Sequence, residues 1–408
     1  MPAIASVATR DLRFPLAAGA GSDAVHGDPV YSFAAVVLEC GDGSTGEGSA
    51  FTLGSGNEVV CDLAATLAEP LIGRDIEDLM SDWGEMSRRL SDHSQLRWLG
   101  PHKGAVHLAL AAVANACFDL WARSRQAPLW QLLLALSDHE LLALLNLDYV
   151  EDVLPAARAL ELIAVARRTR ADRLDVLETG YPAYDTSVGW FHYSDEVIAE
   201  NARRARERGF DAMKLKVGAA DLERDLRRLR ILRDAVGPEA TLMVDANQQW
   251  RWPVAERACR EIAELGVYWI EEPTHPDDVL GHRRLAEAVA PVKIAAGEHI
   301  PNQVLFKNFL QAGAIQVCQV DALRVGGISE FLTVSLLARH FGVPVIPHVG
   351  DMGQLHQHLV LFNHIALGNE RLFLECIPHL SEHFADPAVI ENGRYLTPTA
   401  HGTGLRLK

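Results

Sequence analysis

The chain has 408 residues, of which 49% are hydrophobic and 23% are charged, and its formal net charge is −16. This length is more than one small core needs, and it predicts two domains, one of which can be a large barrel. The acidic balance argues against nucleic acid as a partner, because its phosphates would be repelled. No stretch has the composition of a disordered region, so we expect an ordinary folded protein.

The start of the chain, MPAIASVATRDLRFP, contains no apolar signal core, and no run of about 18 apolar residues follows. The six cysteines lack CxxC pairs and metal-type spacing, which is typical of reduced structural thiols in the cytosol. They are Cys40, Cys61, Cys117, Cys259, Cys318 and Cys376. We therefore expect a cytoplasmic protein without a membrane partner.

The first third of the chain predicts a small α+β domain. The stretch YSFAAVVLECGDGSTGEGSAFT (31–52) has two strand-like halves around a glycine-rich turn, which indicates a β-hairpin. Helical segments follow in EVVCDLAATLAEPLIG (58–73) and in KGAVHLALAAVANACFDLWARSR (103–125). The second segment is apolar on most faces, so we expect it to be a packed, buried helix.

From about residue 141, short apolar runs alternate with helical segments. The runs include DAMKLKV, ATLMVDA and VYWIEE, and the helical segments include DEVIAENARRARERGF and ISEFLTVSLLARHFG. Strands separated by helices indicate βαβ units and a parallel sheet, and seven or eight units in about 235 residues is the size of a TIM-type barrel. A doubly wound sheet is the alternative, but no GxGxxG fingerprint opens the repeats.

Seven successive apolar runs end in an ionisable residue at nearly regular spacing. These residues are Lys216, Asp245, Glu271, Glu298, Asp321, His348 and Glu375, separated by 29, 26, 27, 23, 27 and 27 positions. In a barrel the C-terminal strand ends meet at one face, where active sites lie. A solvent-exposed strand end explains any one of these residues but not the regular spacing of all seven, so we expect one common site.

The carboxylates of this set predict a metal site. Asp245, Glu271 and Glu298 fall on adjacent strands and would repel one another in a partly dry site. A divalent cation relieves that repulsion, and a ligand set made only of oxygens favours Mg²⁺ over Zn²⁺. Since neighbouring residues of a strand face opposite sides, we expect Glu272 to face the helix layer or to form a local pair.

Proton-transfer groups flank these carboxylates. Lys214 and Lys216 are two positions apart and share a face, and two adjacent ammonium groups lower a lysine pKa toward that of a usable base. A pair of surface lysines is the alternative, but the flanking residues are apolar. On the other side, Asp321 next to His348 would fix the imidazole tautomer and raise its proton affinity. Asn247 shares the face of Asp245, where it could hydrogen-bond a substrate. Such a set suits proton removal α to a carboxylate, because positive charge stabilises the developing enediolate.

The chain resembles the mandelate racemase subgroup of the enolase superfamily over nearly its whole length. The resemblance rests on KLK, VDANQQW, WIEEPTHPDD, AAGEH, QVDALRVGG and IPH, in this order. Within the subgroup it is most similar to the L-fuconate dehydratases, through RFP, GSDA, RWLGPHKGAVHLA, GYPAYDTSVGW, DDVLGH and HFADPAVIENGRYLTP. This superfamily uses a Lys or His base with Mg²⁺ to stabilise an enediolate.

The resemblance implies an N-terminal α+β capping domain at 1–138, to which residues 380–408 return, and a modified TIM barrel, (β/α)7β, at 139–379. It implies a lyase, a hydro-lyase that converts a sugar acid, above all L-fuconate, into a 2-keto-3-deoxy acid. It also implies a homo-oligomer. The implied cofactor is Mg²⁺, held by Asp245, Glu271 and Glu298.

By the same resemblance, Lys216 takes the C2 proton, and His348, supported by Asp321, is the general acid for the leaving 3-hydroxyl. Lys214 and Glu375 are expected to contact the substrate carboxylate or the enediolate. The candidate substrate contacts, two of them in the cap segment AGAGSDA, are Ser22, Asp23, Asn247 and His299.

Two other functions stay open. A racemase or epimerase would use the same Lys216 and His348, whereas a non-catalytic relative would be expected to lack a base or a metal ligand. The stretch GDMGQLHQHL (350–359), just after His348, departs from the pattern of the L-fuconate dehydratases. This departure leaves the particular sugar acid open.

Overall fold

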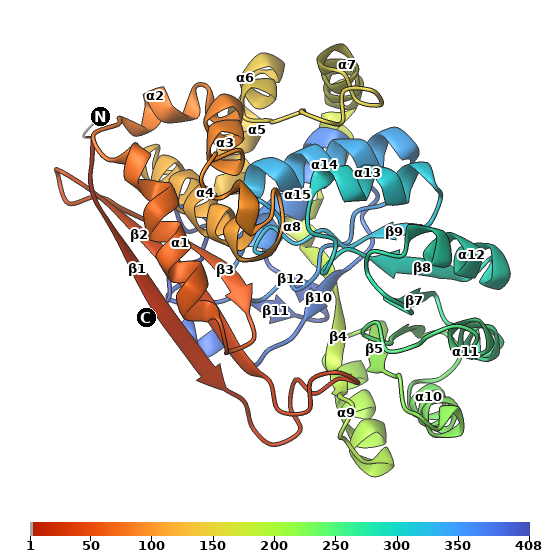
Figure 1. Cartoon of the computed structure of the whole chain (residues 1–408). Coiled ribbons are helices and arrows are strands. Elements are labelled where there is room, and N and C mark those ends of the chain that lie inside the picture. The colour runs from red at the N-terminus through yellow and green to blue at the C-terminus, as the bar shows by residue number, and fades with distance from the viewer. Residues whose placement is uncertain (1–2) are drawn as a thin grey trace.

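The computed structural model describes residues 3–408, which form a sheet-and-helix cap and a barrel (Figure 1). The cap sheet has the order β1-β2-β3 and is antiparallel throughout. Its strands are β1 (Ile4–Pro15), β2 (Val30–Cys40) and β3 (Thr45–Thr52). The predicted hairpin is confirmed as β2 and β3, whereas β1 was not predicted from the sequence.

In the part of the chain that the structure describes, six cap helices accompany this sheet, and the first and the fourth of them pack against its strands. They are α1 (Asn57–Ala68), α2 (Ile76–Met80), α3 (Trp83–Ser91), α4 (Gly104–Ser124), α5 (Leu129–Ala135) and α6 (Asp138–Ala143), with the 3-10 turns η1 (Glu69–Leu71) and η2 (Arg97–Leu99). The predicted packed helix is α4, which is long and apolar enough to cross a membrane by length and composition. However, 89% of its apolar window is buried inside the fold, as in the core helix of a globular domain.

The barrel is built from parallel neighbours in chain order. Its strands are β4 (Tyr181–Gly189), β5 (Ala212–Lys216), β6 (Thr241–Asp245), β7 (Trp269–Glu271), β8 (Lys293–Ala296), β9 (Val317–Cys318) and β10 (Leu374–Cys376). A parallel bridge joins Cys318 to Val345, and β10 returns to pair with β4. The N–H of Gly350 donates to the carbonyl of Glu375 across the remaining gap, at 2.8 Å. The predicted barrel class is therefore confirmed, and the doubly wound alternative is wrong.

Helices surround the barrel on its outside (Figure 1). They are α7 (Ala156–Arg167), α8 (Val176–Thr179), α9 (Asp195–Glu207), α10 (Leu222–Val236), α11 (Val254–Ala263), α12 (Val279–Val289), α13 (Gln303–Gln311), α14 (Ile328–Phe341) and α15 (Leu355–Leu367). Two 3-10 turns are η3 (Arg170–Arg173) and η4 (Ser381–His383), and the last strands are β11 (Ile390–Glu391) and β12 (Arg394–Tyr395).

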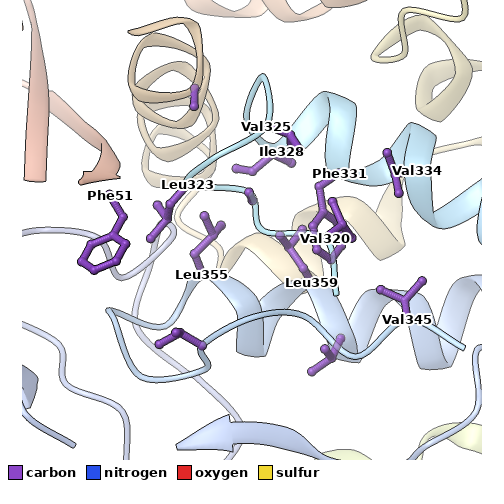
Figure 2. Close-up of a cluster of buried hydrophobic side chains, with 14 of the residues drawn as sticks. Phe51, Val320, Leu323, Val325, Ile328, Phe331, Val334, Val345, Leu355 and Leu359 are labelled. Atoms are coloured by element: carbon purple, nitrogen blue, oxygen red, sulfur yellow. The ribbon is translucent and has the colours of Figure 1, made fainter. Parts of the chain in front are cut away.

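Two apolar clusters fix which residues face the inside of the barrel. The inner cluster takes one residue from each successive strand position and consists of Tyr184, Ala212, Met243, Trp269, Ala295, Val317 and Ile346. The outer cluster lies between strands and helices, and Figure 2 shows part of it, with Val320 and Leu323 packed near Leu355 and Leu359. Because strand residues alternate, the positions two beyond the inner cluster also face inward.

The C-terminal segment contacts both parts of the molecule. Strand β12 pairs with β4 of the barrel, while the N–H and hydroxyl of Thr403 donate to Asp119 of α4 at 2.7 and 2.8 Å. The boundaries 1–138, 139–379 and 380–408 remain our proposal for the domain division. All six cysteines are buried and free.

Candidate active site

Three carboxylates meet at the C-terminal end of the barrel strands. Asp245 and Glu271 are the last residues of β6 and β7 and are paired in register, and Glu298 lies two residues beyond β8. One oxygen of each lies within 4.8 Å of the others, and all three side chains are buried. Burial and the neighbouring Asp245 raise the pKa of Glu271 to about 8, although Lys214 opposes this. A buried site of three carboxylates, with only oxygen donors, fits Mg²⁺.

The two lysines are paired with carboxylates. Lys214 Nζ lies 2.8 Å from both Glu271 Oε1 and Glu375 Oε1, and Lys216 Nζ lies 2.6 Å from Asp245 Oδ2. Burial lowers the pKa of Lys216 and Lys214 repels its charge, but Asp245 outweighs both, so the pKa is raised. The predicted lowering of the lysine pKa is therefore wrong for this arrangement. The two lysines do repel each other, but the adjacent carboxylates have the larger effect, so the pKa of Lys216 rises instead of falling.

Asp321 and His348 lie on the other flank of the carboxylates. Asp321 Oδ2 is 2.8 Å from His348 Nδ1, and His348 Nε2 is 3.0 Å from Glu298 Oε2. Burial lowers the pKa of His348, but Glu298 and Asp321 raise it well above its usual range. In strand order, Lys216 precedes the three carboxylates and His348 follows them.

Glu272 forms the local pair expected of it. Its backbone has φ 42°, and both of its carboxylate oxygens lie 3.1 Å from His299 Nδ1. Gln248 also donates to this carboxylate. His299 Nδ1 is in turn 3.1 Å from Glu298 Oε1, so Glu298 belongs both to the three carboxylates and to a second cluster with Glu272 and His299.

A cavity opens between the barrel and the cap. Its barrel lining is Trp190, Lys216, Asn247, Glu298, His299, Arg324, His348 and Ile377, and its cap lining is Gly21, Asp23, His26, Pro29, Tyr31, Phe51 and Leu53. Four of the predicted site residues thus share this cavity with Asp23 and Glu298. Asn247 Oδ1 also accepts a hydrogen bond from Lys216 at 3.2 Å.

Other predicted residues lie away from this cavity. The Ser22 hydroxyl donates to the carbonyl of Gly19 at 2.7 Å and accepts from the N–H of His192 at 3.1 Å, so it joins the cap loop to the segment after β4. Ser22 is outside the cavity lining, which does not fit the direct substrate contact expected of it. Lys214 and Glu375 pair with each other and are also outside the lining.

Asp23 is the acidic group of the cap side. Its Oδ1 accepts from the N–H groups of Val25 and His26, both at 2.7 Å, and its Oδ2 lies 2.9 Å from His26 Nδ1. Burial raises the pKa of Asp23, but His26 and the nearby Lys216 lower it below its ordinary value. A negative charge is therefore favoured at this wall of the cavity.

Sequence reasoning missed Arg324 and His356. Arg324 Nε donates to the carbonyl of Glu298 at 2.7 Å, and Arg324 lines the cavity. His356 Nε2 lies 3.2 Å from Asp321 Oδ1. Arg324 lies within the QVDALRVGG motif, and His356 lies in the histidine-rich stretch that departs from the dehydratase pattern. Both residues therefore had a signal in the sequence.

Two family models together match most of the chain. Residues 15–133 match the N-terminal domain of mandelate racemase and muconate lactonizing enzyme, and residues 197–408 match the enolase C-terminal domain-like family.

Three relatives illustrate the similarity. Human mitochondrial enolase superfamily member 1 is 42% identical, over 99% of this chain and 94% of the relative, and its crystal structure superposes with a TM-score of 0.96. L-galactonate dehydratase from Hypocrea jecorina is 38% identical, over 98% of this chain and 91% of the relative. The crystal structure of L-talarate dehydratase from Polaromonas sp. JS666, complexed with Mg and L-glucarate, is 27% identical, with a TM-score of 0.77 and coverage of 100% and 96%.

Proposed function

The chain belongs to the mandelate racemase and muconate lactonizing enzyme group of the enolase superfamily, and from this membership we propose an acid sugar dehydratase that acts on L-fuconate. The lyase class is supported by relatives that are named dehydratases of sugar acids. The observation that carries the proposal is the position of Lys216 and His348 on opposite flanks of three buried carboxylates, beneath a partly apolar cap.

Mg²⁺ is the cofactor, since a solved relative at 27% identity holds it and the all-oxygen donor set suits it. We propose Asp245, Glu271 and Glu298 as its ligands. When bound, Mg²⁺ supplies positive charge that favours the enediolate form of the substrate.

Lys216 is the proposed base for the C2 proton. Its Nζ lies in the cavity lining and is held by Asp245 and Asn247. While Asp245 pairs with it, the pKa of Lys216 is raised and the lysine keeps its proton. Lys216 can act as a base only when Asp245 is no longer paired with it. This would be the case if Asp245 were a ligand of the metal ion. The ammonium of Lys214 then favours the neutral form of Lys216.

His348 is the proposed acid for the leaving 3-hydroxyl. Its Nδ1 is bonded to Asp321, so the proton that is transferred is the one on Nε2, which lies 3.0 Å from Glu298 Oε2. The raised pKa of His348 means that the imidazole carries this proton at neutral pH. Loss of the C2 proton and of the 3-hydroxyl as water gives an enol, which tautomerises to the 2-keto-3-deoxy acid.

The cap side of the cavity supports a monocarboxylic substrate. Asp23 places a negative charge there, which disfavours a second substrate carboxylate, whereas Tyr31, Phe51 and Leu53 offer an apolar wall. L-fuconate and L-galactonate have the same configuration from C2 to C5 and differ at C6, which is a methyl group in the first and a hydroxymethyl group in the second. An apolar wall favours the methyl group.

The test is a substrate panel assayed for 2-keto acid with semicarbazide, first with Mg²⁺ and then with EDTA. We expect kcat/KM to be highest for L-fuconate, lower by about tenfold for L-galactonate, and lower still for the diacid galactarate. EDTA and Lys216→Ala should each abolish turnover. Lys293→Ala is the matched control, because Lys293 begins β8 and bonds Tyr268 at 2.6 Å, outside the site.

Two results would contradict the proposal. If L-fuconate gave no 2-keto acid, or gave an epimer instead, the assigned reaction would be wrong. If Lys216→Ala retained wild-type turnover, the assigned base would be wrong.

A further inference from the structure

A second histidine contacts the carboxylate that supports His348. Asp321 Oδ2 lies 2.8 Å from His348 Nδ1, while Oδ1 lies 3.2 Å from Nε2 of His356, the second residue of α15. Asp321 and His356 are 1% and 2% exposed. The carboxylate is therefore enclosed between two imidazoles, one that lines the cavity and one that lies in the packed interior.

The hydrogen bonds define what His356 does. The N–H of Ala322 donates to His356 Nε2 at 2.9 Å. A nitrogen that accepts this bond has no hydrogen to donate, so the 3.2 Å contact of Nε2 with Asp321 Oδ1 is not a hydrogen bond, and His356 holds the turn through the backbone of Ala322. Ala322 directly follows Asp321, and the next N–H, of Leu323, donates to Asp321 Oδ1 at 2.7 Å. These two bonds fix the turn that carries the carboxylate.

The surroundings of this turn are mostly apolar. Figure 2 shows Val320 and Leu323, on either side of the turn, packed near Leu355 and Leu359 of α15. The ring of His356 lies 6.0 Å from that of Phe331. In such a setting an unpaired N–H is costly, and the acceptor on His356 satisfies the one at Ala322.

We propose that His356 is a positioning residue, which holds the peptide after Asp321 so that this carboxylate keeps its bond to Nδ1 of His348. The inference rests on the proposed function, in which His348 is the acid for the 3-hydroxyl. His356 itself is outside the cavity lining and acts only through Asp321.

The first experiment compares two substitutions. His356→Leu fills the space but removes the acceptor, whereas the amide oxygen of His356→Gln is able to accept from Ala322. We expect kcat for 2-keto acid formation to fall by about 10- to 100-fold in the leucine variant, with KM within about threefold of wild type, and glutamine to restore most of kcat. His356→Asn, whose side chain is too short to reach Ala322, replaces the leucine variant if that variant does not fold.

The matched control is His364→Leu. His364 lies at the other end of α15, is also buried, and pairs its Nδ1 with the carbonyl of Asn369 at 2.9 Å. We expect this variant to lose thermal stability but to keep kcat. If His364→Leu lowered kcat as much as His356→Leu did, the effect would be a general one of α15 and the inference would be wrong.

A double-mutant cycle tests whether His356 acts through Asp321. Asp321→Asn should lower kcat by itself. Adding His356→Leu should lower kcat little further, because the support of His348 by the Asp321 carboxylate is already lost. Losses that multiply independently would overturn the inference.

Exchange of the C2 hydrogen in D2O gives a readout that separates the two steps. Lys216 performs the exchange, so it should persist in His356→Leu while formation of 2-keto acid falls. A wild type that forms no 2-keto acid would overturn the proposed function and this inference together. An active wild type whose leucine and glutamine variants lose the same activity would overturn this inference alone.

Discussion

Asp351 is a buried carboxylate that the proposed mechanism does not use. It is 3% exposed, its Oδ1 accepts from the N–H of Ile377 at 2.8 Å, and its Oδ2 lies 3.6 Å from Cys376 Sγ. Burial raises the pKa of Asp351 to about 7, and the nearby Glu375 adds to the shift. The folded chain therefore binds a proton here that the unfolded chain releases at lower pH.

This shift predicts how stability depends on pH. Between an ordinary aspartate pKa of about 4 and the folded value of about 7, the native state binds more protons, so the free energy of unfolding falls as pH rises. Asp351→Asn removes this dependence, and we expect its free energy of unfolding to fall by about 3 to 4 kcal/mol less than that of wild type between pH 4 and pH 8. Urea unfolding at several pH values, with exposed Asp62→Asn as control, measures the difference. Parallel pH curves for wild type and Asp351→Asn would contradict it.

At the residue scale, the sequence predicted the strand-end groups and the pair of Asp321 with His348, but not the carboxylate partners of the two lysines. Alternation along a strand decides which way a residue faces, so Asp245 and Glu271 could be assigned to one centre from spacing alone. The direction in which the pKa of Lys216 shifts depends on the distance between Lys216 and Asp245. The spacing of these residues in the sequence does not give that distance. The contact of His356 with Asp321 likewise depends on how a loop packs on a helix.

At the scale of elements, two glycines explain how α4 approaches the cap sheet. Gly46 and Gly48 lie in β3, where a Cβ on Gly48 would come within 2.1 Å of the backbone nitrogen of Ala116 and 2.5 Å of the carbonyl oxygen of Ala112. The atoms in the way belong to the helix backbone, which cannot move as a side chain can. The glycine-rich half of the hairpin is therefore a packing surface as well as a turn.

Gly48→Ala should accordingly destabilise the protein. We expect a loss of about 3 kcal/mol, because α4 must shift away from β3 and disturb the buried apolar cluster. Gly41→Ala is the control in the same hairpin, since a Cβ there meets nothing within 4 Å. Urea unfolding measures both variants, and equal stabilities would show that α4 is not held at this distance.

The barrel strands were predicted in order but not in length. β9 has only two residues and Val345 forms only a bridge, so Glu298, Asp321 and His348 lie on the segments that leave the strands. Apolar runs continue past these strand ends because Val320 still packs outward against Phe331 (Figure 2). β1 was not predicted because half of this edge strand is exposed, and its exposed positions include the polar residues Ser6, Asp11 and Arg13.

At the scale of the whole molecule, Asn115 is one of the side chains that join the cap to the barrel. Asn115 of α4 is fully buried, and its Nδ2 donates to the carbonyls of Ser49 and Ala322 at 3.1 and 3.0 Å. Its Oδ1 accepts from the N–H of Ile328 at 3.1 Å. The cap is thereby tied to the loop that carries Asp321, and this contact couples two parts that the sequence predicted only as separate domains.

This coupling predicts that Mg²⁺ stabilises the cap, although its three proposed ligands all lie in the barrel. A ligand that binds only the folded state adds about 2.7 kcal/mol at 100 times its Kd, and every region that unfolds with the site shares that gain. Hydrogen exchange should therefore slow in α4 and β3 as well as in β6 and β7 when Mg²⁺ replaces EDTA.

Asn115→Leu should weaken this link, because it removes the two bonds from this side chain to the barrel, at Ala322 and Ile328. In this variant we expect Mg²⁺ still to slow exchange in β6 and β7, but to slow exchange in α4 less than it does in the wild type. Asn363→Leu is the matched control, since this fully buried asparagine of α15 donates to Ser335 at 2.9 Å and has no bond to the cap among residues 3–408. Its exchange pattern should respond to Mg²⁺ as wild type does. If Mg²⁺ did not slow hydrogen exchange in α4 of the wild type, the cap would unfold independently of the metal site, and the prediction would be wrong.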